Sequence, residues 1–82
     1  MENIYFLSDY MICANIGARI KSMRLKQNIT QQSLAESAQV SLSTIKSIES
    51  GEIKSFDSLL RVFRIIGKLD IFQSLMEEEQ LT

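Results

Sequence analysis

The sequence predicts an all-α protein with five helices in a single domain. The chain has 82 residues, no proline and only three glycines, and it is rich in residues with high helix propensity. Apolar residues recur at intervals of three and four, whereas no alternation with a period of two recurs. A chain this short buries a limited core, so association with a second copy is a natural way to bury more apolar surface.

Composition argues against several classes of protein. The N-terminal segment has neither a basic flank nor a long uninterrupted apolar run, so we expect a cytoplasmic protein without a secretory or membrane-spanning segment. Because the chain has no histidine and only one cysteine, it can form neither a His-based triad nor a zinc site. We therefore expect no enzymatic activity, no metal and no cofactor. Cys13 is expected to be a buried small apolar residue rather than a reactive thiol.

Residues 1–8 form an N-terminal arm, and the first helix is predicted over residues 9–28. The arm is apolar from Ile4 to Leu7, so it either packs back on the body or covers a partner chain. Ser8 is a favoured N-cap residue, and an asparagine at position 28 tolerates the left-handed conformation that ends many helices. Gly17 within this helix indicates close approach of another helix. The helical spacing predicts an inward stripe of Ile12, Ile16, Ile20 and Met23.

Residues 30–51 have the pattern of two short helices joined by a tight turn. Thr30 is expected to cap the first of them, and Ser41 the second. Gln39 and Val40 form the turn between them, and Gly51 ends the unit. The spacing places the apolar Ile45 and Ile48, with Glu49, on one side of the second helix. The opposite side carries Ser43, Lys46, Ser47 and Ser50.

Residues 55–78 are predicted to form the last two helices, and residues 79–82 a solvated acidic tail. The fourth helix begins after Ser55 and ends at Gly67, and Asp70 is expected to cap the fifth. Val62 and Ile65 lie off the main apolar stripe of the fourth helix, so this helix is apolar on more than one side. We therefore expect a homodimer interface. Its predicted residues are Val62, Ile65, Phe72, Leu75 and Met76, with help from the arm.

The helix–turn–helix geometry favours binding to double-stranded DNA. In this arrangement one helix crosses the phosphate backbone and the other enters the major groove. Gln31 adds a donor at the N-terminus of the first helix, where a phosphate is favoured. On the outward face of the second helix, Ser43 and Ser47 can donate or accept, Lys46 can reach a guanine or a phosphate, and Leu42 can pack on a thymine methyl group.

The charge distribution agrees with a nucleic-acid surface in the first part of the chain. Residues 16–55 include six basic and three acidic side chains, whereas residues 56–82 include three basic and five acidic ones. Such a split suits a positive face on the helix–turn–helix unit. Without the motif, an ordinary mixed surface would explain it equally well.

The segment from Ile16 to Ile66 resembles the phage repressor/Cro-type helix-turn-helix family, also called the XRE family. The resemblance rests on the joint spacing and residue type of Arg24, Thr30, Gln31, Leu34, Ala35, Val40, Ser41, Ile45, Ile48, Glu49 and Gly51. It implies a five-helix repressor-like DNA-binding domain. It also implies a sequence-specific transcriptional regulator, expected to be a repressor that binds an inverted repeat as a dimer.

The resemblance also implies roles for individual residues. Bases would be read by Leu42, Ser43, Thr44, Lys46 and Ser47. Phosphates would be contacted by Gln31, Ser50 and Lys54. Arg24 and Glu49 would form an ion pair that orients the second helix of the motif.

Two positions depart from the family pattern. Gln39 stands where members usually have a glycine in the turn, and a positive φ there would cost about 1 kcal/mol. Leu42 stands where a polar base-reading residue is common, so recognition would depend more on van der Waals contact and DNA shape.

A second hypothesis is a protein-interaction subunit. The family includes antitoxins that neutralise a kinase-like toxin and repress their own operon. The apolar arm and the compact five-helix body are compatible with that group, so a toxin is the alternative partner.

Overall fold

The protein is represented by a computed structural model that describes residues 3–77, and these residues contain only helices and their connections. The five α-helices confirm the predicted class. They are α1 (Asp9–Lys26), α2 (Gln31–Ala38), α3 (Leu42–Glu49), α4 (Phe56–Ile66) and α5 (Gln73–Met76). Two 3-10 turns, η1 (Ile4–Phe6) and η2 (Leu69–Phe72), precede α1 and α5. No helix in this part of the chain has the length and apolar character needed to cross a membrane.

A hydroxyl side chain begins each of the first four helices, and three of these caps, Ser8, Thr30 and Ser41, were predicted. Ser8, Thr30, Ser41 and Ser55 accept hydrogen bonds from the backbone N–H groups of Met11, Ser33, Thr44 and Ser58, at 3.0–3.2 Å. Each cap satisfies one of the N–H groups that a helix start leaves without a partner, and is worth about 1 kcal/mol. The caps therefore define where the two helices of the motif start.

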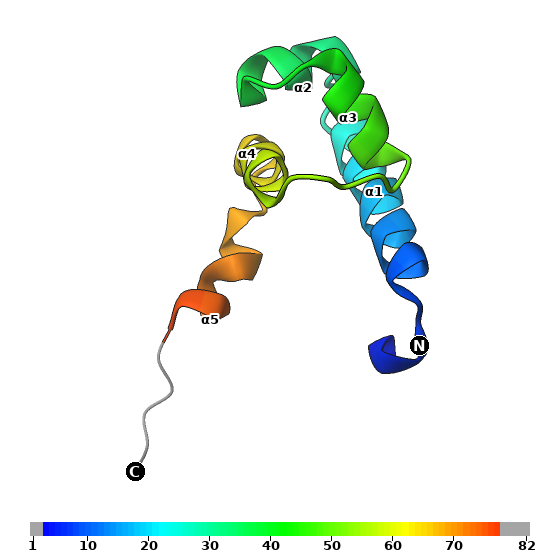
Figure 1. The fold of residues 1–82 in the computed structure, drawn as a ribbon. Coiled ribbons are helices and arrows are strands. Elements are labelled where there is room, and N and C mark those ends of the chain that lie inside the picture. Colours follow the sequence, from blue (N-terminus) through cyan, green and yellow to red (C-terminus); the bar gives the residue numbers. More distant parts are fainter. Residues whose placement is uncertain (1–2, 78–82) are drawn as a thin grey trace.

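Helix α4 occupies the centre of the molecule, where it packs against α1, α2 and η2 (Figure 1). Helices α2 and α3 lie at one end, and η1 and α5 lie toward the opposite end. The buried apolar residues come from four helices and form one core. Its members are Ile20, Met23, Leu34, Ala35, Ala38, Ile45, Ile48, Leu59, Val62, Phe63 and Ile66.

Gly17 lies at the crossing of α1 and α3, which confirms the close approach expected from a glycine inside a helix. A Cβ atom at this position would collide with the carbonyl oxygen of Ile48 and lie 2.8 Å from that of Glu49. Gly51 makes the reverse contact, because a Cβ there would lie 2.9 Å from Ala14 Cα. Backbone thus meets backbone on both sides, and α3 sits directly on α1.

Gln39 adopts the left-handed conformation, with φ 59° and ψ 44°, at the end of α2. An L-residue with a Cβ is strained there, whereas glycine is not. We expect Gln39→Gly to raise the free energy of unfolding by about 0.5–1 kcal/mol. For a domain of this size, each kcal/mol raises the melting temperature by about 4–8 °C.

The control for this prediction is Asn28→Gly, because Asn28 is also left-handed, with φ 57°. Asparagine tolerates this conformation better than glutamine does, so its replacement should gain less. A Gln39→Gly melting temperature at or below that of the wild type, measured by circular dichroism, would contradict the strain at this turn.

The C-terminal part of the chain differs from the prediction. Instead of one helix capped by Asp70, the chain forms the 3-10 turn η2, which contains Asp70, and then the four-residue α5. No side chain caps either element. Phe72 ends η2, and its ring packs edge-on against Phe63 and Phe56, with ring centroids 5.4 and 5.5 Å apart.

Candidate nucleic-acid interface

Helix α3 presents one apolar and one polar side. Ile45 and Ile48 are buried in the core, while Ser43 and Lys46 are exposed on the outward side. The turn between α2 and α3 is closed by a hydrogen bond from Val40 N to Ala35 O at 3.0 Å. The division of α3 into two sides therefore agrees with the periodicity of its sequence.

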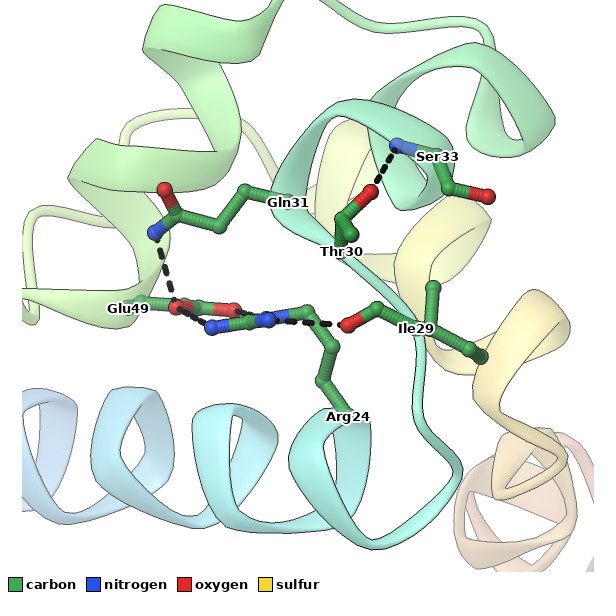
Figure 2. Close-up of polar contacts among 6 residues, drawn as sticks. All are labelled: Arg24, Ile29, Thr30, Gln31, Ser33 and Glu49. Carbon is green, nitrogen blue, oxygen red and sulfur yellow. Dashed lines mark hydrogen bonds and ion pairs between the residues drawn. The ribbon is translucent and has the colours of Figure 1, made fainter.

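Arg24 of α1 and Glu49 of α3 form a two-pronged ion pair beneath the motif (Figure 2). Arg24 Nε donates to Glu49 Oε2 at 2.6 Å, and Arg24 Nη2 donates to Glu49 Oε1 at 3.1 Å. The remaining guanidinium nitrogen, Nη1, donates to Ile29 O at 2.8 Å, just before α2 begins. One side chain thus ties together α1, the connection to α2, and α3.

Both partners of this ion pair are almost fully buried, with 7% and 4% of their side-chain surface exposed. Among the described residues no buried side-chain nitrogen or oxygen lacks a hydrogen-bond partner. A buried ion pair adds little net stability over an apolar pair of the same shape, because desolvation offsets the attraction. Its geometry, in contrast, fixes the position of α3 relative to α1.

Gln31 lies in the first turn of α2, and its side chain points toward Glu49 (Figure 2). Its Nε2 donates to Glu49 Oε1 at 3.0 Å, and the residue is half-buried. The sequence placed Gln31 at the phosphate backbone and missed this contact. An amide nitrogen has two hydrogens, so Gln31 can hold Glu49 with one and still offer the other to a phosphate.

Three of the predicted base-reading residues and one predicted phosphate ligand line the same groove. Its volume is about 180 Å³ and it runs beside α3 toward the start of α4. The predicted residues in it are Ser43, Thr44, Ser47 and Lys54. The groove also contains Glu52, Ser55 and Ser58, which sequence reasoning did not select. Ser55 had been predicted only to precede the fourth helix, and nothing in the local spacing indicated that the start of α4 returns to α3.

The hydroxyl groups on this surface differ in their availability. The Thr44 hydroxyl shares a hydrogen bond of 2.8 Å with Ser41, and the Ser50 hydroxyl donates to Ser47 O at 2.9 Å. Donation from Ser50 to a phosphate would therefore require its present bond to break. Ser43, Lys46 and Lys54 are exposed, and Leu42 and Ser47 are half-buried.

The predicted dimer interface needs correction at the fourth helix. Val62 has no exposed surface and belongs to the core, so it cannot contact a second chain. Helix α4 packs against α1, α2 and η2 within the same chain. Ile65 and Phe72 are half-buried against the core. Of the five predicted residues, Leu75 and Met76 remain largely exposed, at 75% and 79%.

Comparison with known proteins agrees with this geometry. The model of the Helix-turn-helix family matches residues 20–71, which is more than half of the chain and includes α2, α3 and α4. No curated protein gives a significant match. The family is one of DNA-binding regulators and not of enzymes. The chain belongs to this helix-turn-helix family, of the XRE or Cro/C1 type, and is a DNA-binding transcription regulator.

Proposed function

We propose that this protein is a repressor that binds an inverted repeat in double-stranded DNA as a homodimer. The observation that carries the proposal is the buried contact of Arg24 with Glu49, which holds α3 in one orientation with its polar side outward. A helix fixed in this way can enter the major groove at a defined angle. The family match gives no support to the toxin-neutralising alternative.

In this proposal α3 reads bases and its surroundings contact phosphates. Bases are read by Leu42, Ser43, Thr44, Lys46 and Ser47. Gln31 contacts one phosphate, and Ser50 and Lys54 contact a second one. Serine hydroxyls and one lysine supply few two-pronged contacts to bases, so the specificity of one copy is low. Two copies at a fixed spacing raise it, which makes dimerisation part of recognition.

Selection of bound duplexes from a random pool tests this function. The selected sequences are expected to contain an inverted repeat whose half-site centres lie about 10 base pairs apart, or a multiple of this. Recovery of a single unrepeated site would contradict binding as a dimer. A pool that stays random after several rounds would contradict sequence-specific binding itself.

Replacing Lys46 separates DNA binding from folding. Lys46 is exposed on α3, so we expect Lys46→Ala to keep the melting temperature and to weaken binding to the selected duplex at fixed salt. If Lys46 contacts a phosphate, the slope of log K against log salt falls by about 1. If it contacts a guanine, discrimination at that base pair falls by about 1–3 kcal/mol.

Lys26→Ala is the matched control, since it removes the same charge from an exposed position near the end of α1. Equal losses of affinity in the two variants would show a general charge effect rather than a contact made by α3.

A further inference from the structure

Several exposed large apolar side chains belong to η1, the first turn of α1 and α5, which lie toward the end of the molecule opposite the motif (Figure 1). Tyr5 and Phe6 of the N-terminal arm are 91% and 85% exposed, and Tyr10, in the first turn of α1, is 83% exposed. Leu75 and Met76 of α5 are exposed to a similar extent. Exposed aromatic and aliphatic side chains of this size are typical of an interaction site when a partner covers them.

An apolar pocket of about 310 Å³ lies between α1, α4 and η2. Its walls are Ile16, Met23, Phe63 and Ile71, and the cations Arg19 and Lys68 also line it. Within residues 3–77 neither cation forms an ion pair. The pocket therefore suits an apolar side chain that is accompanied by an acidic group.

We propose that the arm of one chain docks in this pocket of a second copy, and that the arm of the second copy docks in the pocket of the first. Phe6, with Tyr5 beside it, enters the apolar pocket, and Asp9 lies near the cations Arg19 and Lys68 of the other chain. An aromatic anchor in a pocket is the usual centre of a protein interface. A reciprocal contact of this kind gives a closed two-fold dimer. The inference rests on the proposed dimer and adds the arm and its pocket to it.

The charge of the arm identifies a protein rather than DNA as its partner. Residues 1–10 include two acidic side chains and no basic one, so phosphate repels this segment. The cations at the pocket, in contrast, attract it. Because a second copy carries both the arm and the pocket, two copies satisfy both surfaces at once.

The position of the arm argues against docking in the pocket of its own chain. Ser8 caps α1 through the bond from Met11 N, at 3.1 Å, and the arm continues past that end of the helix. The pocket residues Ile16 and Met23 lie two to four turns farther along α1. Occupation of its own pocket would require the arm to reverse direction at the cap.

The available area approaches that buried in a stable dimer. A buried aromatic side chain covers 150–250 Å², so Tyr5, Phe6 and Tyr10 together offer roughly 500 Å². Ile71, Leu75 and Met76 add a few hundred more on the other side of the contact. The total approaches the roughly 800 Å² per partner that a specific interface buries.

The test measures dimer dissociation by sedimentation equilibrium without DNA. The first variant is the double substitution Tyr5→Ser with Phe6→Ser, at two positions that take no part in the core. We expect its dissociation constant to rise at least 30-fold over that of the wild type. Leu25→Ser is the matched control, because Leu25 is 55% exposed on α1 and lies outside this pocket. It should keep the wild-type constant.

A mixing experiment tests whether the contact is exchanged between chains. The pocket variant combines Arg19→Gln with Ile71→Gln, and it too should dimerise weakly. Mixed with the arm variant, it should form a heterodimer tighter than either homodimer, because one intact arm then meets one intact pocket. A mixture no tighter than its components would overturn the exchange, as would a monomeric wild type or an arm variant within twofold of the wild type.

These outcomes are separate from those of the DNA selection. The arm contact fails alone if the arm variant stays dimeric while the wild type still selects an inverted repeat. The proposed function fails alone if the wild type dimerises through the arm but selects no duplex.

Discussion

Gly17→Ala is expected to destabilise the domain by about 1–2 kcal/mol, although alanine is the better helix former. Helix propensity alone predicts a gain of about 1 kcal/mol at this position. The added methyl group, however, meets the backbone of Ile48, Glu49 and Gly51, which cannot rotate away as a side chain can. Overpacking against such a rigid surface costs about 1–3 kcal/mol and occasionally more. The loss is large compared with a total stability of 5–15 kcal/mol.

The sign of this effect makes the experiment decisive. Chemical denaturation of Gly17→Ala should give a lower midpoint, and DNA affinity should fall with it because α3 is displaced from α1. Ala18→Gly calibrates the propensity scale, since Ala18 is exposed on the same helix. A Gly17→Ala chain more stable than the wild type would show that α1 and α3 do not make this close contact.

Arg24→Ala is expected to cost about 3–5 kcal/mol, because it leaves the Glu49 carboxylate buried without its cation. Gln31 would remain as one donor to Glu49, at 3.0 Å, and one neutral amide does not replace a guanidinium. Arg24→Lys should also be destabilising. A lysine cannot reproduce the two bonds to Glu49 together with the one to Ile29 O.

The double replacement Arg24→Met with Glu49→Leu distinguishes orientation from stability. Exchange of a buried ion pair for apolar residues is often neutral or stabilising, so the double variant should be more stable than Arg24→Ala. Its DNA specificity should nevertheless fall, because the two directional hydrogen bonds that fix the angle of α3 are then lost. Chemical denaturation measures the stability of each variant, and DNA titration of the same samples measures its specificity. Full specificity in the double variant would show that the ion pair has no orienting role.

Local features of the sequence predicted most of the fold. The capping bonds of Ser8, Thr30 and Ser41 each span three residues, so residue type and the apolar spacing that follows are sufficient to locate them. The left-handed Asn28 and the close approach at Gly17 were also predictable, because each depends mainly on the residue itself.

Features that depend on distant neighbours were not predictable. Val62 was assigned to the surface because it lies off the main stripe of its helix. In the fold Val62 is fully buried and α4 packs against α1, α2 and η2, and no local pattern shows which elements will pack there. The last helix was predicted to be too long because Phe72 fits a helical stripe. The contacts of its ring with Phe63 and Phe56, in contrast, depend on the tertiary fold.

The candidate site shows the same division. The resemblance identified Arg24 and Glu49 as a pair 25 residues apart, and their geometry agrees with it. The contact from Gln31 to Glu49 was missed, because the exposed position expected for Gln31 gave no reason to search for a buried partner. The contribution of Glu52, Ser55 and Ser58 to the groove was missed as well, since it depends on how α4 returns toward α3.

We propose that the polar side of α3 reads a DNA sequence. Its most direct test is a competition at fixed salt between the selected duplex and a scrambled one of the same composition. The wild type is expected to prefer the selected duplex by 10³-fold or more, roughly the lower limit for specific binding. Ser43→Ala with Ser47→Ala should keep the melting temperature and the affinity for the scrambled duplex, and lose most of the preference. Equal binding of both duplexes by the wild type, or an unchanged preference in the double variant, would contradict the account.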